Sequence, residues 1–495
     1  MPPINLGWLI LISLIPFIIR LDTIASIKDL KPRLIKAFIQ GSLFGFIFMG
    51  FSNLWIFELI RYSGWLQITC LYFIFTIMQS LFYSFLATIY CGFRFSITMF
   101  PFLWIIFEWF RASGLFASTH YNLAYSQALN GVFLQYASVG GLYLVSFLCV
   151  FVNVGIIIWV RNNRHFFSTK KNYRHFTLPL ILVFLIIGNH LLTLSPQLDP
   201  PTTPLKIGLF QPNHAQLDKQ NKRKRFTLIR DYVHAVQEKL DQEKLDLIMF
   251  PETIIPRALD NQLFMMALNN FTTSANTSFL FGSSRKPDQH IFNSVVLVDS
   301  ENNISTYNKV NLMPFGEYWP YKKVFKFFSL NNLIPSTEYR AGDLIHPISF
   351  GSYELGVGIC LELMYPDFFN TQTKKGADIL ISLANSAWFH DSWISKALFE
   401  MAILRAVENG RYVIQVSNIG ISGIVSPDGH IVVSSELNKP SFLSESLTVY
   451  KKDTIYSLYG DWFVRLSFLI ILIVGLFISI NRLKNSILTV KTHYM

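Results

Sequence analysis

The chain has 495 residues, of which 51% are hydrophobic and 16% aromatic, while only 15% are charged. This composition, with a mean hydropathy of +0.36, excludes an ordinary soluble protein and indicates several membrane spans. The formal net charge of +11 is compatible with nucleic-acid binding, but many of the cations lie in loops between apolar segments.

Residues 1–195 are predicted to form a membrane domain with about six transmembrane helices. The apolar segments of this region are residues 4–19, 37–59, 65–90, 95–110, 132–160 and 176–194. The first segment has no basic residue before it and no small-residue cleavage site, so we expect an uncleaved span. A further apolar segment, residues 464–480, precedes a basic tail, and we assign residues 456–495 to a C-terminal transmembrane helix and that tail.

The basic residues indicate how the spans are oriented. They are concentrated in the first, third and fifth loops and in the tail, at Arg20, Lys28, Lys31, Arg33, Lys36, Arg94, Arg161, Arg164, Lys170, Lys171, Arg174, Arg482, Lys484 and Lys491. The positive-inside rule places these loops and the tail in the cytoplasm. Six spans then put the N-terminus and residues 195–463 on the opposite side. The charge is therefore largely a topology signal, and we expect no nucleic-acid partner.

One loop on the side opposite the cytoplasm carries unusual polar residues. Glu108 and Arg111 end the fourth span, and the loop then runs through His120 to Tyr125-Ser126-Gln127. Ionisable groups at membrane depth are costly and mark functional sites. The alternative is an interfacial Glu108–Arg111 pair within an aromatic belt, and the sequence leaves both interpretations open.

A linker of residues 196–205, rich in proline, separates the membrane domain from residues 206–455. Short apolar runs bounded by turn residues predict strands in this second region. They are Lys206–Gln211, Asp246–Phe250, Ser278–Gly282, Asn293–Val298, Leu355–Ile359, Asp378–Leu383, Tyr412–Val416 and Ile421–Ser426. Helical patterns lie between them at residues 218–240 and 394–409. Interleaved strands and helices predict one α/β domain inserted between the spans.

Cys360 directly follows one of the predicted strands, and Glu362 and Pro366 come soon after it. A thiol at a strand-to-helix elbow lies beside backbone N–H groups that can hold an oxyanion. An isolated cysteine is more often an inert buried residue. The other cysteines, Cys70, Cys91 and Cys149, show no CxxC spacing, so we expect neither a disulfide framework nor a metal site.

Two further reactive residues also follow predicted strands. Glu252 comes after the run that ends in Pro251, and Lys309 comes after Tyr307-Asn308. A carboxylate, an ammonium and a thiol at three strand ends can perform acyl transfer. Glu252 would take the thiol proton, Cys360 would attack a carbonyl, and Lys309 would stabilise the oxyanion. Taken singly, Glu252 could be a helix cap and Lys309 a surface lysine.

The ordered set Glu252, Lys309 and Cys360 resembles the Glu-Lys-Cys triad of the nitrilase, or carbon–nitrogen hydrolase, superfamily. Further motifs are similar to apolipoprotein N-acyltransferases of bacterial inner membranes. These motifs are Tyr307-Asn-Lys…Pro314-Phe-Gly-Glu317, Asn385-Ser-Ala-Trp388-Phe389, Arg405-Ala406…Glu408-Asn-Gly-Arg411, Gly420-Ile-Ser-Gly, Tyr459-Gly-Asp-Trp462, Glu108-Trp-Phe-Arg111 and Tyr125-Ser-Gln127. The family commonly has a tyrosine directly after the nucleophile, where this chain has Leu361.

The resemblance implies a nitrilase-like α-β-β-α sandwich for residues 206–455, on the periplasmic side of a bacterial inner membrane. It also implies an acyltransferase without a cofactor. Such an enzyme moves a fatty acyl chain from a phospholipid to the N-terminal amine of a diacylglyceryl apolipoprotein through a cysteine thioester.

Further site residues are expected around this triad. Glu317 and Glu362 are expected to hold Lys309 or relay protons. The aromatic residues Trp319, Trp388, Phe389 and Tyr125 are candidates for substrate binding, although core packing explains them equally well. The main alternative function is a membrane-tethered amidase or nitrilase that hydrolyses a small amide, and a catalytically inactive lipoprotein-binding protein is the alternative from another class.

Overall fold

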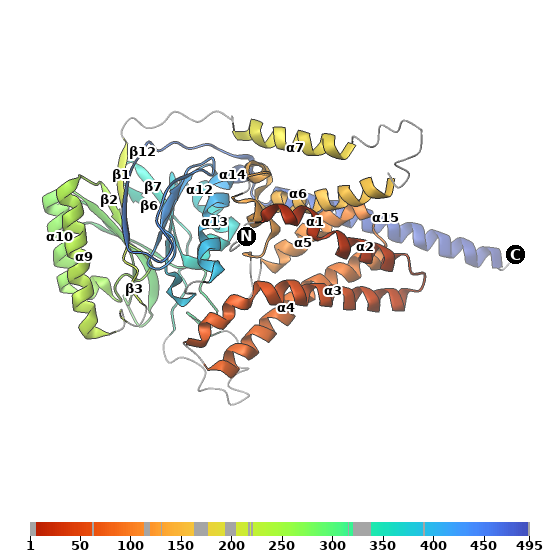
Figure 1. Cartoon of the computed structure of the whole chain (residues 1–495), viewed down its shortest axis with the longest axis horizontal. Coiled ribbons are helices and arrows are strands. Elements are labelled where there is room, and N and C mark those ends of the chain that lie inside the picture. The colour runs from red at the N-terminus through yellow and green to blue at the C-terminus, as the bar shows by residue number, and fades with distance from the viewer. Residues whose placement is uncertain are drawn as a thin grey trace. The chain divides into compact units, whose positions relative to one another are not determined.

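The computed structural model describes residues 6–61, 64–112, 119–129, 131–162, 177–193, 204–215, 218, 221–314, 316–319, 338–389 and 392–493. The chain divides into two compact units. A helical unit consists mainly of Pro3–Leu194 and Asp461–Met495, and an α/β unit consists mainly of Ser195–Gly460. Each unit is described by itself below (Figure 1).

Apolar helices make up the helical unit. They are α1 (Ile10–Ser13), α2 (Ile15–Ala25), α3 (Leu30–Ser52), α4 (Trp65–Phe93), α5 (Phe100–Arg111), α6 (Ala137–Asn162), α7 (Thr177–Thr193) and α15 (Trp462–His493), with short 3-10 turns between several of them. Leucine, isoleucine and phenylalanine side chains remain exposed along α3, α4 and α15. In a bilayer, lipid chains solvate such surfaces, so these helices have the composition of membrane-embedded elements.

Five stretches of the described residues are long and apolar enough to cross a membrane. They are Gly7–Ala25, Leu30–Ser52, Trp65–Phe93, Leu134–Asn162 and Trp462–Asn485. Two of the predicted spans form shorter helices, α5 with 12 residues and α7 with 17 residues. The number of spans and their orientation therefore stay predictions.

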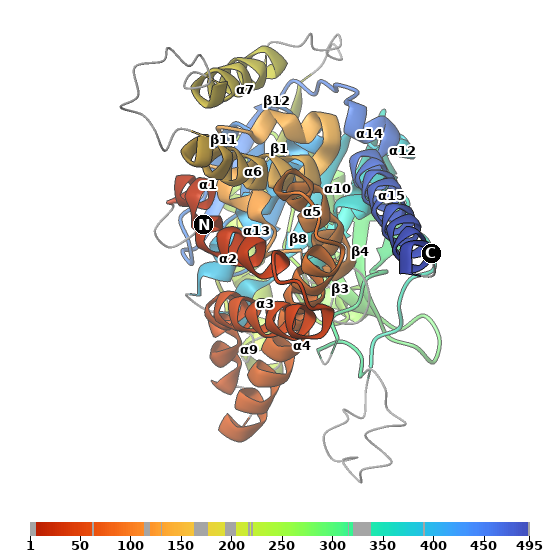
Figure 2. The ribbon, with the colours of Figure 1, turned by 90° about the vertical axis from the view of Figure 1, so that its right-hand side faces the viewer.

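Helices α3 and α4 lie side by side in close contact (Figure 2). A Cβ atom added at Gly41 would lie 2.4 Å from the carbonyl oxygen of Tyr83, and one added at Gly45 would lie 2.8 Å from Ser80 Cα. Glycine four residues apart on one helix face lets two helix backbones approach closely. The pair is thus held by backbone-to-backbone packing.

Glu108 and Arg111, at the end of α5, both bind the segment 119–127. Glu108 Oε1 accepts a hydrogen bond from the Leu123 N–H at 3.1 Å, and Arg111 donates one to Asn122 Oδ1 at 2.5 Å. Within the described residues, no ion pair joins Glu108 to Arg111. The two charges still act on each other, so the interpretation as an interfacial Glu108–Arg111 pair stays a prediction, and each side chain also satisfies a polar group of this buried, irregular segment.

Two six-stranded sheets form the centre of the α/β unit. In spatial order, the first sheet contains β12 (Ser441–Leu447), β1 (Leu205–Gln211), β2 (Leu247–Met249), β3 (Ser278–Arg285), β4 (Phe292–Val298) and β5 (Ile304–Asn308). The second contains β11 (Ile431–Ser434), β10 (Gly423–Val425), β9 (Tyr412–Ser417), β8 (Ile379–Ala384), β7 (Tyr353–Ile359) and β6 (Ile348–Phe350).

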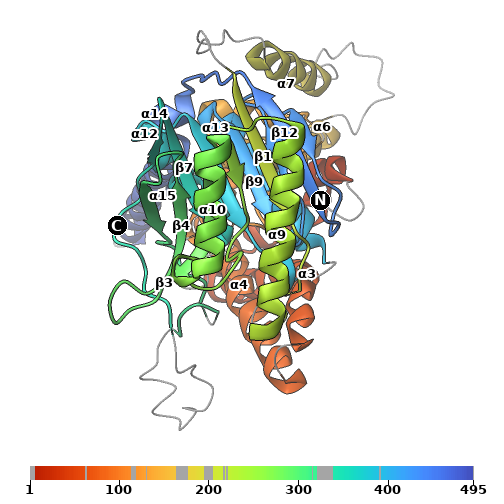
Figure 3. The ribbon, with the colours of Figure 1, turned by 90° about the vertical axis from the view of Figure 1, so that its left-hand side faces the viewer.

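Helices cover the outer faces of the two sheets. Helices α9 (Lys222–Gln242) and α10 (Gln262–Ala275) lie across the first sheet (Figure 3), where Leu228, Phe264 and their neighbours join a buried core with β2 and β3. Helices α12 (Pro366–Lys374) and α13 (Trp393–Asn409) pack on the second sheet, and the short α14 (Ile455–Tyr459) packs against α12. The predicted α-β-β-α sandwich is confirmed.

Within the first sheet, β1, β2 and β3 are parallel, while β4 is antiparallel to both β3 and β5. Strands β2 and β5 therefore end at the same edge of the sheet. In the second sheet, β7, β8 and β9 are parallel. The residues that follow β2, β5 and β7 are the three candidate catalytic residues.

The first and last strands of the unit are neighbours. β1 pairs with β12 in antiparallel register from Leu205↔Leu447 to Gln211↔Ser441. The buried side chain of Gln211 also connects the two sheets, because its Oε1 accepts hydrogen bonds from Ser422 at 2.6 Å and Ser435 at 3.0 Å. The unit is consequently closed by contacts between its two ends.

Candidate active site

Glu252 is held at the end of β2 by close backbone packing. Ile254 N–H donates to the carbonyl of Gly282, and Gly282 N–H donates to the carbonyl of Pro251. A Cβ atom at Gly282 would lie 2.6 Å from Glu252 Cα and 2.7 Å from the backbone nitrogen of Thr253. Since neither backbone atom can move away cheaply, glycine is needed here for Glu252 to approach β3.

Lys309 follows β5 directly and is almost completely buried, with 2% of its surface exposed. Its N–H donates to the carbonyl of Asn293 on β4, and its own carbonyl accepts from Gly342. Its ammonium lies 2.8 Å from Glu317 Oε2 and 3.9 Å from Glu252 Oε1. A buried ammonium needs such partners, because an unpaired charge away from water is strongly unfavourable.

Cys360 stands at the turn between β7 and the 3-10 turn Cys360–Met364. Its φ of +52° lies in the left-handed region, which a non-glycine residue rarely adopts. Such a conformation costs about 1–3 kcal/mol and persists where surrounding structure enforces it. A strained turn directly after a buried strand presents the side chain at the end of the sheet, as nucleophile elbows do.

The charges around these residues act on one another. Burial alone would lower the pKa of Lys309, but the negative charges of Glu317 and Glu252 outweigh it and raise that pKa above the ordinary value. Burial raises the pKa of the Cys360 thiol, Glu252 raises it further, and Lys309 opposes both. The resting pair is therefore a protonated thiol beside a permanently charged ammonium, so the thiol needs a base at the moment of reaction.

Asn293, near the start of β4, connects the two carboxylates. Its Nδ2 donates to Glu252 Oε1 at 2.9 Å and to Glu317 Oε1 at 2.7 Å. The other oxygen of Glu317 accepts from the Met313 N–H at 2.7 Å. The sequence analysis did not single out Asn293, because an asparagine at the start of an apolar strand carries no signal of its own.

Glu362 is fully buried two residues after Cys360. Its Oε1 accepts from Tyr307 at 2.8 Å and from the N–H groups of Val310 at 2.8 Å and Asn311 at 3.0 Å, and its Oε2 accepts from Ile359 N–H at 2.9 Å. Burial raises the pKa of Glu362 to about 7, against these donors. Glu362 thus ties the Cys360 turn to the segment after Lys309, without an ion pair to Lys309 among the described residues.

Two further asparagines, Asn385 and Asn418, form a hydrogen-bonded pair next to the Cys360 thiol. The backbone of Asn385, which follows β8, forms a hydrogen bond with Cys360 that lowers the thiol pKa. Asn418 Nδ2 donates to Asn385 Oδ1 at 3.0 Å and to the carbonyl of His214 at 2.8 Å. Asn385 belongs to a motif noted in the sequence, but its contact with Cys360 depends on β8 lying next to β7.

The aromatic residues proposed to bind substrate have different surroundings. Phe389 is 2% exposed within the α/β unit, and Tyr125 is 2% exposed within the helical unit, which is the burial of packed core side chains. The backbone N–H of Trp319 donates to Glu338 Oε1 at 2.9 Å. The Trp388 side chain and the aromatic run after Trp319 lie outside the described residues. A substrate-binding role for these four residues stays a prediction.

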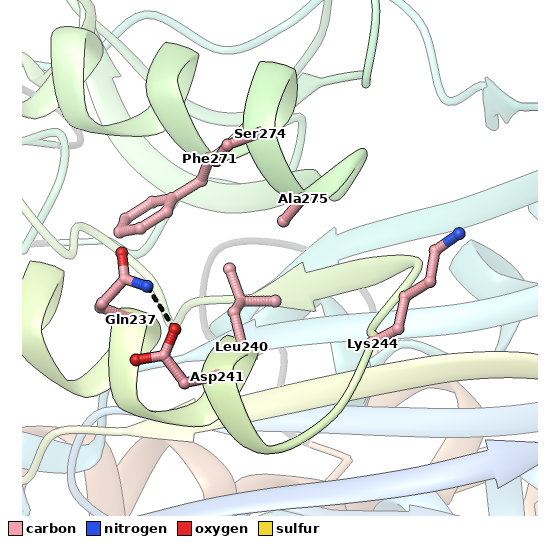
Figure 4. Close-up of a pocket in the computed structure, with 7 residues that line it drawn as sticks. All are labelled: Gln237, Leu240, Asp241, Lys244, Phe271, Ser274 and Ala275. Carbon is pink, nitrogen blue, oxygen red and sulfur yellow. Dashed lines mark hydrogen bonds between the residues drawn. The ribbon is translucent and has the colours of Figure 1, made fainter.

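One hollow on the described surface lies away from this site. It measures about 350 Å³ and lies between the ends of α9 and α10, lined by Gln237, Leu240, Asp241, Lys244, Phe271, Ser274 and Ala275 (Figure 4). These helix ends lead into the beginnings of β2 and β3, whereas Glu252 follows the end of β2. Over the same described residues, no cluster of three or more His, Cys, Asp or Glu is arranged to hold a metal ion.

Comparisons with known proteins agree with this arrangement. Residues 206–444 match the carbon–nitrogen hydrolase family, and residues 1–155 match the N-terminal domain of apolipoprotein N-acyltransferase. The chain is 27% identical over 395 residues to the apolipoprotein N-acyltransferase of Rickettsia typhi, covering 77% of this chain and 76% of that protein. It is 26% identical over 435 residues to the one of Coxiella burnetii, covering 84% and 86%.

Among solved structures, Nit3 of Saccharomyces cerevisiae, a nitrilase-superfamily protein, aligns with a TM-score of 0.39 and 17% identity over 53% of this chain and 96% of that one. The two family matches follow one another along the chain, separated by residues 156–205, and these two relatives cover about three quarters or more of it. The expected resemblance is confirmed, and the chain belongs to the apolipoprotein N-acyltransferase family.

Proposed function

We propose that this protein transfers a fatty acyl chain from a membrane phospholipid to the N-terminal amine of the diacylglyceryl-cysteine of apolipoproteins. The observation that carries the proposal is the buried cluster of Cys360, Glu252 and Lys309. In this cluster, the charges of Glu252 and Lys309 both act on the pKa of the Cys360 thiol. The names of the relatives and the apolar helices of the same chain support an acyltransferase that works on lipid-anchored substrates.

In the first half-reaction, Glu252 accepts the proton of the Cys360 thiol as the sulfur attacks the sn-1 ester carbonyl. The tetrahedral oxyanion forms beside the ammonium of Lys309, which stays charged throughout. The carbon–oxygen bond to glycerol then breaks, and the leaving alkoxide takes the proton from Glu252. The products are a lysophospholipid and a thioester on Cys360.

In the second half-reaction, the amine of the apolipoprotein attacks the thioester. Glu252 accepts a proton from the attacking nitrogen, and Lys309 again stabilises the oxyanion. The carbon–sulfur bond breaks, Cys360 leaves as a thiolate and recovers its proton from Glu252. A thioester suits this exchange, because it is more reactive toward an amine than the starting ester is.

Glu317 has a separate function in this scheme. Its contact with Lys309 at 2.8 Å is shorter than the 3.9 Å contact of Glu252 with the same ammonium. We assign Glu317 to positioning the Lys309 side chain and keeping its ammonium charged. Glu252 is then left to exchange protons with the thiol and with substrate groups. We further propose that the site faces the periplasm of a bacterial inner membrane, as the distribution of basic residues predicts.

The same three residues would equally suit a membrane-tethered amidase that hydrolyses a small amide. Mass spectrometry of a lipoprotein N-terminus from cells with and without the protein separates the two functions. An acyltransferase leaves a third acyl chain, on the amine, only in cells that contain it. A free amine on the lipoprotein in both strains, with hydrolysis of small amides by the purified protein, would establish the amidase instead.

A further inference from the structure

Asn293 is the one described side chain that donates hydrogen bonds to both carboxylates around Lys309. It is 4% exposed, and its backbone carbonyl also accepts the N–H of Lys309 at 2.8 Å. One residue of β4 therefore contacts the segments that follow β2 and β5, on either side of it in the sheet. Asn293 is thus a common hydrogen-bonding neighbour of Glu252, Glu317 and Lys309.

The chemistry of the amide determines how Asn293 is oriented. Its NH2 group has two protons, and the two carboxylates accept one each. Turning the amide over would place Oδ1 against two negative oxygens, so the observed orientation is the stable one. Its Oδ1 is buried and finds no hydrogen-bond partner among the described residues, which is an unfavourable arrangement. The contacts to Glu252 and Glu317 are kept in spite of it.

Hydrogen bonds from a neutral donor favour the ionised form of a carboxylate. Glu252 and Glu317 repel each other, and Lys309 supplies a single positive charge for both. Cys360 and Tyr339 are buried near the same charges. For both groups, burial and the charge of Glu252 raise the pKa, and the pKa of Tyr339 is raised to about 12. Asn293 is the neutral donor that lies between the two carboxylates around this one ammonium.

We propose that Asn293 is a positioning residue that holds the carboxylates of Glu252 and Glu317 in place around Lys309 and favours the ionised form of Glu252, so that Glu252 is ready to take the thiol proton. The effect of Asn293 on acyl transfer rests on the proposed function, whereas its effect on the thiol does not. A purely structural asparagine would change the amount of folded protein and leave the pH at which the site loses its reactivity unchanged.

The test measures the reactivity of Cys360 without any acyl substrate. The full-length protein in detergent is alkylated with iodoacetamide between pH 5 and 9, and the rate at Cys360 is followed by peptide mass spectrometry, which excludes signal from the other cysteines. The variants are Asn293→Ala, which removes both donors, and the nearly isosteric Asn293→Asp, which replaces them with a third carboxyl group. Thr277→Val is the matched control, because it loses a buried 2.7 Å hydrogen bond before the start of β3 and touches none of the site residues.

We expect the acid limb of the alkylation profile to move up by about one pH unit in Asn293→Ala, so that the rate near the limb falls about tenfold. Asn293→Asp should move it at least as far, because a third carboxylate adds repulsion. Thr277→Val should keep the wild-type midpoint. Unchanged midpoints with uniformly lower rates in both Asn293 variants, at wild-type melting temperature for Asn293→Asp, would overturn the proposal.

Acyl transfer is then measured on the same preparations with phospholipid and a diacylglyceryl peptide. In the Asn293 variants, we expect kcat for acylation to fall and the KM for phospholipid to stay within about twofold, since Asn293 is buried and its side chain donates to the two carboxylates. If the wild-type protein shows the alkylation profile but transfers no acyl chain, the proposed function fails and the function of Asn293 in the thiol site still stands. A rise in KM alone would contradict the positioning of Glu252.

Discussion

Replacing Lys309 by methionine tests the site most directly, because this ammonium contacts both carboxylates. Methionine keeps much of the length of the side chain and removes the charge. Lys309 is 2% exposed, so Glu317 at 2.8 Å and Glu252 at 3.9 Å would be left as buried carboxylates without their cation. Breaking a buried ion pair from one side typically costs about 3–5 kcal/mol of folding free energy. Asn293 and the Met313 N–H still stabilise the carboxylates, so we expect the lower part of this range.

The effect on rate is separate from the effect on stability. A preorganised donor at an oxyanion is worth about 3–4 kcal/mol, or on the order of 10²–10³ in rate. Both half-reactions pass through such an oxyanion. Lys309→Met should therefore slow formation of the acyl-enzyme and its aminolysis by comparable factors.

A double variant separates the two effects. Lys309→Met with Glu317→Gln removes the unpaired charge nearest to the lost ammonium, so its melting temperature should recover toward the wild type. Its acyl-transfer rate should stay as low as that of Lys309→Met alone. The wild-type protein and Glu317→Gln are the reference points of the double-mutant cycle.

Acylation is followed by incubating each protein with phospholipid alone and measuring the added acyl mass on Cys360. Aminolysis is timed after adding a diacylglyceryl peptide to the trapped thioester. Recovery of acyl transfer in the double variant would refute the reasoning, because it would show that Lys309 acts only by neutralising Glu317. Unchanged rates for both steps in Lys309→Met would refute the oxyanion assignment itself.

Cys360→Ser should fold and insert normally yet lose turnover, since a hydroxyl is a far poorer nucleophile than a thiolate; normal transfer by the purified variant would exclude Cys360 as the nucleophile. Glu252→Gln should form no acyl-enzyme with phospholipid alone, because an amide cannot take the thiol proton; acylation at the usual rate would reassign the base. The pKa of Glu362 is raised from 4.5 to about 7, so its contribution to stability is complete below about 4.5 and is lost as pH rises through 7. The difference in unfolding free energy between the wild type and Glu362→Gln should thus favour the wild type most below about pH 4.5 and shrink by up to about 3 kcal/mol toward pH 8, and a constant difference would contradict this. Reporters fused after Thr193 and after Lys484 should report locations outside and inside the cytoplasm, respectively, and a cytoplasmic signal from the first would exclude the predicted topology.

Much of the sandwich could be predicted from the sequence, because its central strands are buried on both faces. β8 and β9 have no exposed residue and are short runs of apolar side chains bounded by turns, so their signal is strong. The four edge strands, β5, β6, β11 and β12, are absent from the predicted strands. Their residues are mostly half-buried or exposed, as in Ser441–Leu447, so they lack the long buried apolar runs of the central strands. The pairing of β12 comes from β1, a neighbour that is distant in the chain.

The candidate site divides in the same way. Lys309 and Cys360 directly follow β5 and β7, and Glu252 comes three residues after β2, so residues close to strand ends in the sequence were good candidates. The contacts of Asn293 and Asn385 could not, because they depend on which strands are neighbours in each sheet. The sequence placed Glu362 near Lys309 as a possible partner, whereas its hydrogen bonds go to Tyr307 and to backbone N–H groups.

The pairing of β1 with β12 has a consequence for synthesis of the chain. Leu205 opposes Leu447, so the first strand of the α/β unit can pair with β2 early, but nearly the whole unit must be translated before its other neighbour, β12, exists. At about 5–20 residues per second, this interval is roughly ten to fifty seconds. During it, one edge of β1 presents unpaired backbone groups, and the contacts of Gln211 with Ser422 and Ser435 cannot form. The sheet that carries Glu252 and Lys309 is therefore completed only as the ribosome reaches the last helix.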